Sequence, residues 1–156
     1  MSLPVVIIHV LTTMSLLCNL SLAPIQPAEE RTPDPDDVVM VSQTVWGEAK
    51  GCSRVEQEAV VWCILNRVDD GRFPNTISGV ITAKNQFSGY SPNFPSADFM
   101  ELAEDVLTRW HNGEHGIPTD LVFFRADGHG HNTFYSECFG GHVYTWENMM
   151  ENDLAD

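Results

Sequence analysis

The sequence predicts an α+β fold, in which a small antiparallel sheet is appended to a mainly helical domain. Two observations predict it. Residues 38–113 show the caps and apolar spacing that are typical of helices, whereas residues 121–124 and 142–146 are rich in β-branched and aromatic side chains. The chain has 156 residues, which is the length of one domain with a single buried core.

The N-terminal segment is predicted to lie outside this domain. The first charged side chain is Glu29, residues 5–22 are mostly apolar, and Ser21 to Ala23 offers the small residues that a signal peptidase reads. Residues 1–23 are therefore predicted to be a signal peptide, with a membrane tether through residues 5–22 as the alternative. Either would export the rest of the chain, so the expected location is secreted or in the cell envelope.

A linker and a single domain are predicted to follow. Residues 24–37 hold four prolines and several acids with almost no apolar residue, which is typical of a flexible acidic linker. The folded domain is predicted over residues 38–150. Its first helix should run from Val38 to Lys50, with Asp36 and Asp37 at its N-terminus and Gly51 after its end.

The second helix is predicted to be the central one. Ser53 and Glu56 form a capping-box pattern, and apolar residues then occupy most of the circumference up to a stop near Gly71. A short helix from Ile77 to Ala83 should follow, capped by Asn75 or Thr76. After a polar loop, Ser96 should cap a third long helix that ends at residues 112–113.

The C-terminal third is predicted to supply the sheet. Leu121–Phe124 and His142–Trp146 are interpreted as two short strands, and the glycine- and histidine-rich stretch between them as a loop.

Charge and cysteine content restrict the partners. The chain has 22 acidic and 8 basic residues, a formal net charge of -14, and such a field repels nucleic acid. Outside the export segment, Cys52, Cys63 and Cys138 allow at most one disulfide, and their spacing is not that of a zinc site. We expect small buried cysteines with at most one bridge, no cofactor, and a monomer.

Glu48 is the candidate catalytic residue. On a helix that turns about 100° per residue, Val41, Val45 and Glu48 fall on one face, so the apolar pair should carry Glu48 towards the interior. It also lies in the last turn, where the helix dipole opposes a negative charge. Both effects favour the protonated carboxyl, which glycosidic bond cleavage needs as a proton donor. The alternative is a surface glutamate near a frayed helix end.

Several short motifs resemble those of one known family in order and spacing. They occupy residues 46–51 (WGEAKG), 57–60 (QEAV), 65–68 (LNRV), 73–81 (FPNTISGVI) and 86–88 (QFS), with 121–124 and 141–144 further on. Together they are similar to the cell-wall hydrolase family of the spore cortex-lytic enzyme type (SleB/CwlJ-like). The resemblance covers residues 38–146. Departures occur at Cys52-Ser53-Arg54 and at Glu56, just after the catalytic position, and the 129–131 loop has no counterpart in the pattern.

This resemblance implies a lysozyme-like fold, related to lytic transglycosylases, that acts on the glycan strands of peptidoglycan. The family's catalytic glutamate falls on Glu48. Because no second carboxylate stands out, a single-acid scheme is expected, namely lytic transglycosylation between N-acetylmuramic acid and N-acetylglucosamine. Residue type and the family pattern give these expected sugar-binding residues: Asn66, Gln86, Phe87, Ser88, Tyr90 and Tyr144, the last on the opposite wall of the groove. For each of them a purely structural role is the alternative.

Two other classes of function stay open. His129, His131 and His142, with Glu137, lie close in the sequence and include ligand types that zinc prefers, which would suit a metal-dependent hydrolase. No metal is expected, because a glycine-rich loop gives the rings no common register. A non-catalytic glycan-binding module would keep the fold and the aromatic residues but leave Glu48 idle.

Overall fold

The computed structural model describes residues 32–90, 92, 96–138 and 140–153, and it confirms the α+β class. The elements in chain order are α1 (Pro35–Ala49), α2 (Arg54–Asp69), α3 (Ile77–Thr82), α4 (Ala97–His111), β1 (Phe123–Ala126), β2 (Asn132–Glu137), β3 (Gly140–Tyr144) and α5 (Trp146–Asp153). Within this described part, no helix is long and apolar enough to cross a membrane. The predicted export segment, residues 1–23, lies outside the described residues.

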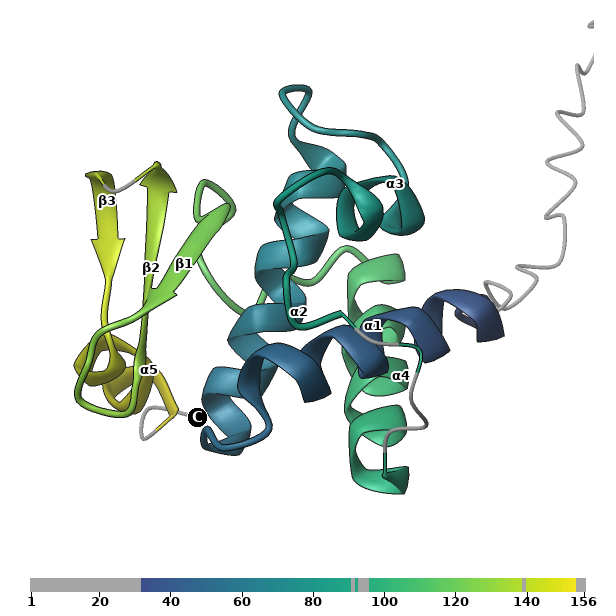
Figure 1. Cartoon of the computed structure of the whole chain (residues 1–156), viewed down its shortest axis with the longest axis horizontal. Helices are drawn as coiled ribbons and strands as arrows, with labels where there is room; N and C mark the ends of the chain where they lie inside the picture. The colour runs from purple at the N-terminus through teal and green to yellow at the C-terminus, as the bar shows by residue number, and fades with distance from the viewer. Residues whose placement is uncertain (1–31, 91, 93–95, 139, 154–156) are drawn as a thin grey trace, which may run out of the picture.

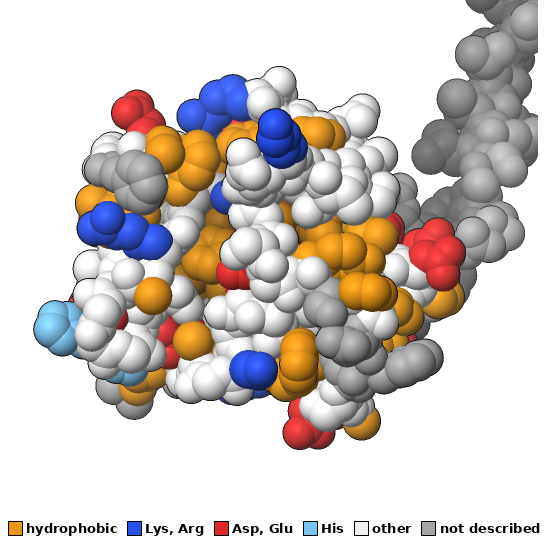
Figure 2. All heavy atoms as spheres, viewed as in Figure 1, with side chains coloured by type: hydrophobic (Ala, Val, Ile, Leu, Met, Phe, Trp, Pro, Cys, Tyr) orange, Lys and Arg blue, Asp and Glu red, His pale blue; other side chains and the backbone are white. Residues whose placement is uncertain are grey.

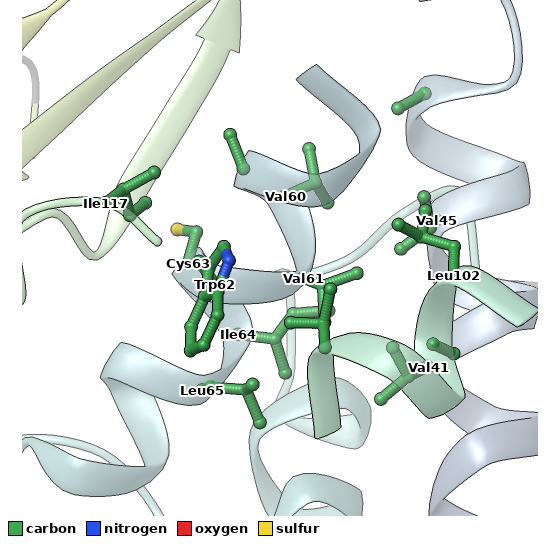
Figure 3. Packing of buried hydrophobic residues seen from close by; sticks show 14 of the residues in the cluster. Val41, Val45, Val60, Val61, Trp62, Cys63, Ile64, Leu65, Leu102 and Ile117 are labelled. Atoms are coloured by element: carbon green, nitrogen blue, oxygen red, sulfur yellow. The ribbon is translucent and has the colours of Figure 1, made fainter. Parts of the chain in front are cut away.

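Helix α2 is the centre of the fold, as predicted. Helices α1, α3, α4 and α5 and strand β1 all contact it, and in Figure 1 the sheet stands on the other side of α2 from α4. Residues 59–65 of α2 are at most 2% exposed, and Figure 3 shows Val61 and Ile64 among side chains of neighbouring helices. Each fully buried large apolar side chain contributes about 1.5–3 kcal/mol, so this helix supplies much of the stability.

Helix caps fix where the helices begin. The predicted capping box of α2 is present, and Thr76 caps α3 by accepting a hydrogen bond from the Gly79 N–H. The start of α1 was predicted wrongly. Asp34 is its N-cap and Pro35 opens the helix, so the last three residues of the predicted linker are helical. Proline suits the first helical position because no N–H is needed there.

The sheet has three strands rather than two. β2 pairs with β1 on one side and β3 on the other, all antiparallel, and Phe124, Phe134 and Tyr144 form one row across it. This row faces inward, since Phe134 and Tyr144 are buried. The stretch interpreted as a loop therefore contains β2, and the turn between β1 and β2 is confined to residues 127–131.

The last predicted strand ends two residues too late. Tyr144 closes β3, and Trp146 opens the short helix α5. The cause is a local cap: the backbone N–H and the hydroxyl of Thr145 both donate to Asn148 Oδ1. Such a side-chain cap stabilises the first turn of a helix, although Trp146 itself favours strands.

The space between the sheet and the helices is hollowed. Figure 2 shows a depression that runs between the sheet and the body formed by α1 and α3, with apolar side chains on its floor and basic and acidic atoms near them. One pocket of this region, about 210 Å³ in volume, is lined by Arg67 of α2, Gln86 of the loop after α3, and residues of β1 and β2.

Candidate active site

Glu48 lies in the last turn of α1, half-buried, on the face that also carries the fully buried Val41 and Val45. The predicted orientation is therefore confirmed. The Gly89 N–H donates a hydrogen bond to Glu48 Oε1 with an N–O distance of 2.6 Å. This bond joins the end of α1 to a loop 41 residues further along the chain.

The end of α1 is held from α2. The side-chain amide of Gln57 donates to the carbonyl oxygens of Ala49 and Cys52, and the Cys52 N–H donates to Ala49. Carbonyl groups at the end of a helix have no partner within the helix, so these bonds replace the missing ones. They keep the turn that carries Glu48 from fraying.

Two glycines allow the loop to cross α1 at this point. A Cβ atom added to Gly47 would lie 1.7 Å from the carbonyl oxygen of Gly89. A Cβ added to Gly89 would lie 2.6 Å from the carbonyl carbon of Gly47 and 3.0 Å from Cδ of Glu48. All three distances are shorter than van der Waals contact, so the two backbones can touch only because both residues lack side chains.

Arg67 is a buried cation beside this loop. It is 4% exposed, its Nε–H donates to the carbonyl oxygen of Val122, and its NH1 donates to Gln86 Oε1 at 2.8 Å. Its guanidinium also lies over the rings of Phe73, Phe87 and Phe123, at 4.8–5.5 Å from their centroids. Arg67 thus holds the Gln86–Phe87 segment that leads to Gly89.

The charge of Arg67 also reaches Glu48. Burial lowers the pKa of Arg67 from its ordinary value, while Cys63 and then the carboxylate of Glu48 act in the opposite direction. No carboxylate of the described residues lies within ion-pair distance of Arg67. Arg67 is thus a buried cation whose described hydrogen-bond acceptors are a carbonyl oxygen and an amide oxygen.

The predicted sugar-binding residues divide into two groups. Gln86 and Ser88 are exposed, Tyr90 is half-buried, and all three belong to the loop that contacts Glu48. Phe87 is buried in the core against Phe124, with a ring-centroid distance of 6.1 Å. Gln86 and Ser88 are therefore accessible to a ligand, whereas Phe87 has little surface to offer.

Asn66 and Tyr144 lie elsewhere. The amide of Asn66 is buried and donates to the carbonyl oxygens of Pro118 and Leu121, which is a structural role. Tyr144 is buried and lines a second pocket together with Trp62 and Met149. Neither residue lines the pocket at Arg67 and Gln86.

Two further acids in the motif region have partners. Glu56 is 1% exposed, and its carboxylate accepts hydrogen bonds from the backbone N–H groups of Ser53 and Asn132. The side chain of Glu58 is 30% exposed and pairs with Arg109 at 2.7 Å.

The histidines are not gathered into one site. His131 Nδ1 lies 3.3 Å from Glu56 Oε2 and its ring stacks on Trp146, whereas His142 Nδ1 lies 3.1 Å from Asp120. Over the ranges that the structure describes, no group of three His, Cys, Asp or Glu side chains is placed to hold a metal ion. The arrangement gives the metal-dependent alternative no support.

The three cysteines are free thiols, so the single disulfide that the sequence allowed is not formed. Cys63 is fully buried, Cys52 is half-buried and Cys138 is exposed, which contradicts the expectation that all three are buried.

The sequence analysis did not identify Arg67 or the Gly89 N–H as part of this site. Arg67 stands in the LNRV motif, and an arginine on the helix that was predicted to be central and buried is a signal that could have been used. Nothing local in the sequence reveals the Gly89 contact, since it depends on how the loop crosses α1.

Relatives of this chain share both its sequence and its fold. Spore cortex-lytic enzymes of Bacillus cereus and Halalkalibacterium halodurans are 32% and 46% identical over 92 residues, which is 59% of this chain and 36% and 28% of theirs. The chain thus spans about a third of the length of these relatives. The crystal structure of the catalytic domain of the Bacillus cereus SleB protein superposes with a TM-score of 0.53 and 27% identity, covering 61% of this chain and 73% of that one.

The family match covers α2, α3, α4 and the sheet. Residues 51–145 match the family described as Cell Wall Hydrolase, and Glu48 lies just before this range. The match extends over more than half of the 156 residues, and the relatives and the solved domain point to the same group. The chain therefore belongs to the cell wall hydrolase family.

Proposed function

We propose that this protein cleaves the glycan strands of peptidoglycan, with Glu48 as the only acid and base. The observation that carries the proposal is the position of the Glu48 carboxyl: half-buried at a helix end, with Oε1 fixed by the Gly89 N–H. Fixing one oxygen orients the whole carboxyl group, so that Oε2 can deliver a proton in one direction. Relatives that are named spore cortex-lytic enzymes support the substrate class.

The proposed reaction is lytic transglycosylation. Protonated Glu48 gives its proton to the oxygen that leaves C1 of N-acetylmuramic acid, and the C1–O bond breaks. The carboxylate then accepts the proton of that sugar's C6 hydroxyl, and O6 forms a bond to C1. The products are a free 4-hydroxyl and a 1,6-anhydro end, and no water is consumed.

The other two acids of the motif region, Glu56 and Glu58, already have hydrogen-bond or ion-pair partners, and this favours transglycosylation over hydrolysis. A hydrolysing glycosidase commonly uses a second carboxylate, either as nucleophile or to activate water. Glu56 is buried and accepts a hydrogen bond from the Asn132 N–H. Glu58 pairs with Arg109 and accepts a hydrogen bond from the Trp62 Nε1–H.

Replacing the proposed acid tests the proposal. Glu48→Gln should abolish the release of soluble fragments from purified sacculi, because the amide keeps the size and the Gly89 contact but has no acidic proton. The melting temperature should stay close to wild type. The matched control is Glu101→Gln, an exposed acid on α4, which should lyse like wild type. Substantial lysis by Glu48→Gln would show that another group is the acid.

Mass spectrometry of the released glycans tests the reaction type. Transglycosylation leaves 1,6-anhydro ends, whereas hydrolysis adds water and leaves reducing ends 18 Da heavier, a difference fixed by the added water in the glycosidase scheme. Reducing ends would keep Glu48 as the acid but replace the single-acid mechanism. Binding to sacculi without any release would support the glycan-binding module instead.

Export of the domain stays part of the proposal. An envelope substrate requires the domain to leave the cytoplasm, and residues 1–23 are the predicted means. N-terminal sequencing of the protein secreted by a bacterial host would show cleavage after Ala23 for a signal peptide, and an intact N-terminus in the membrane fraction for a tether.

A further inference from the structure

Asn85 has an unusual backbone conformation at the start of the loop that reaches Glu48. Its φ angle is 63°, and over the described ranges it is the only residue other than glycine with a positive φ. In this left-handed region the Cβ atom crowds the following carbonyl oxygen, so glycine adopts it readily and asparagine more often than most other residues. The side chain of Asn85 is exposed, so packing in the core does not impose the conformation.

The conformation belongs to a tight turn directly after α3. The Gln86 N–H donates to the carbonyl oxygen of Ala83 at 3.2 Å, which closes a four-residue turn with Asn85 in its third position. A positive φ at that position is typical of turns that reverse the chain, and it favours glycine or asparagine. In Figure 1 the chain that follows α3 accordingly runs back to α1.

Three anchors follow the turn within a short segment. The Gln86 side chain accepts a hydrogen bond from Arg67 at 2.8 Å, and Phe87 is buried in the core. The Gly89 N–H then donates to Glu48 Oε1. Each residue contributes only two soft backbone dihedrals, so this segment cannot form all three contacts if the chain leaves the turn in another direction. The anchors and the turn therefore depend on one another, which is how a strained backbone conformation persists.

We propose that Asn85 is a positioning residue for Glu48. Its left-handed backbone, rather than its amide group, directs the loop so that the Gly89 N–H meets Oε1 and orients the carboxyl group. The inference rests on the proposed function for the role of Glu48 as the acid. Asn85 makes no contact with the substrate in this proposal, and it acts on the reaction only through the loop.

Two substitutions at this position separate the backbone from the side chain. Asn85→Gly removes the amide group but adopts a positive φ freely, so it should behave like wild type. Asn85→Val disfavours the left-handed region, because a β-branched side chain is more crowded there, and the native turn should become about tenfold less populated. Asn112→Val is the matched control, since Asn112 is also exposed but has a φ of -84°.

Hydrogen exchange at the Gly89 amide measures the contact with Glu48 without any substrate. The exchange rate should rise about tenfold in Asn85→Val and stay at the wild-type value in Asn85→Gly and Asn112→Val. The lysis of sacculi should change in parallel: kcat should fall about tenfold in Asn85→Val, while KM stays within about twofold of wild type. A residue with only a structural role would lower the melting temperature and leave both Gly89 exchange and kcat unchanged.

Three outcomes would overturn the inference. They are wild-type exchange at Gly89 in Asn85→Val, losses in Asn85→Gly as large as those in Asn85→Val, and faster exchange in Asn85→Val with an unchanged kcat.

Failure of this inference is distinguishable from failure of the proposed function. If exchange at Gly89 follows the expected order but wild-type protein releases nothing from sacculi, the positioning of Glu48 is supported and the enzymatic proposal is wrong. If lysis depends on Glu48 while Asn85→Val changes neither exchange nor kcat, the enzymatic proposal is supported and the role of Asn85 is wrong.

Discussion

Gly47 shows how a residue without a side chain shapes the proposed site. It precedes Glu48 on α1 and lies directly against Gly89, where any Cβ atom would collide with backbone. The same crossing brings the Gly89 N–H to the Glu48 carboxyl. The glycine at position 47 of the WGEAKG motif is thus required by the close packing that places the acid, rather than by chain flexibility.

Gly47→Ala should therefore disable the protein more than a single methyl group usually does. Because the added Cβ would lie 1.7 Å from the Gly89 oxygen, the loop must move away from Glu48. We expect a stability loss of about 1–3 kcal/mol in urea unfolding and a large loss of lysis. Gly51→Ala is the control, since nothing lies within 4 Å of its Cβ. Wild-type lysis by Gly47→Ala would contradict the close crossing.

Arg67 holds the loop that contacts Glu48 through its hydrogen bonds, and two variants test this role. Arg67→Met removes the bonds to Val122 and Gln86, so the loop that carries Gly89 should loosen, and both the melting temperature and lysis should fall. Arg67→Lys keeps the charge but loses the planar pair of bonds to Val122 and Gln86.

For Arg67→Lys we therefore expect a lower kcat as well, although the charge is kept. Arg72→Met is the control, because Arg72 is exposed and paired with Asp70. Wild-type lysis by both Arg67 variants would show that these bonds do not position the loop beside Glu48.

The site was partly predictable from the sequence for physical reasons. The orientation of Glu48 follows from helix geometry, which depends only on local spacing. The roles of Arg67 and Gly89 depend on contacts between residues 19 and 41 positions apart. Residue type alone also could not distinguish exposed Gln86 from buried Phe87, because neighbours on a loop lack the regular alternation of a strand.

At the scale of elements, a buried acid joins the start of α2 to the sheet. Glu56 closes the capping box of α2 and also accepts the Asn132 N–H of β2 at 2.8 Å, with His131 beside it. Cys52 accepts a hydrogen bond from the Asn132 amide. Residues at and just before the start of α2 thus contact the end of the 127–131 turn and the first residue of β2.

Glu56→Ala should weaken this connection between the start of α2 and the sheet. It leaves the buried Asn132 N–H and the Ser53 N–H without their acceptor, which costs about 1–3 kcal/mol for each fully buried group. The melting temperature should fall, and hydrogen exchange should speed up most at the Asn132 amide. Glu104→Ala, at an exposed position of α4, should change neither. Slow exchange at Asn132 in Glu56→Ala would mean that another group holds the turn.

Most helices were predictable, whereas one strand and one helix were not. The capping box of α2 and the apolar stripe of α4 are local signals, so both helices lie within a few residues of their predicted ends. β2 (NTFYSE) has only two aromatic residues among polar ones, and it is a strand because β1 and β3 pair with it on both sides. α5 begins where it does because Asn148 caps Thr145, and a threonine followed by an asparagine three residues later is a weak signal in a sequence.

At the scale of the whole molecule, Cys63 marks the centre of the core. It is 0% exposed within α2, and burial raises the pKa of its thiol to about 12. Burial also raises the pKa of half-buried Cys52, while Cys138 is exposed. Only a thiolate reacts readily with a disulfide reagent, so these three thiols should report three different degrees of opening.

Thiol labelling at pH 8 in a Cys18→Ser background should therefore show three phases. Cys138 should react at once and Cys52 more slowly. Cys63 should react only when the domain unfolds, because it lies on α2 and the elements packed around α2 would have to separate from it first. Urea should accelerate the last phase with the dependence measured for global unfolding. Cys63→Ala identifies that phase by removing it. Labelling of Cys63 at a rate independent of urea would show instead that the helices and the sheet move apart without unfolding, and α2 would then be a hinge rather than the centre of one cooperative core.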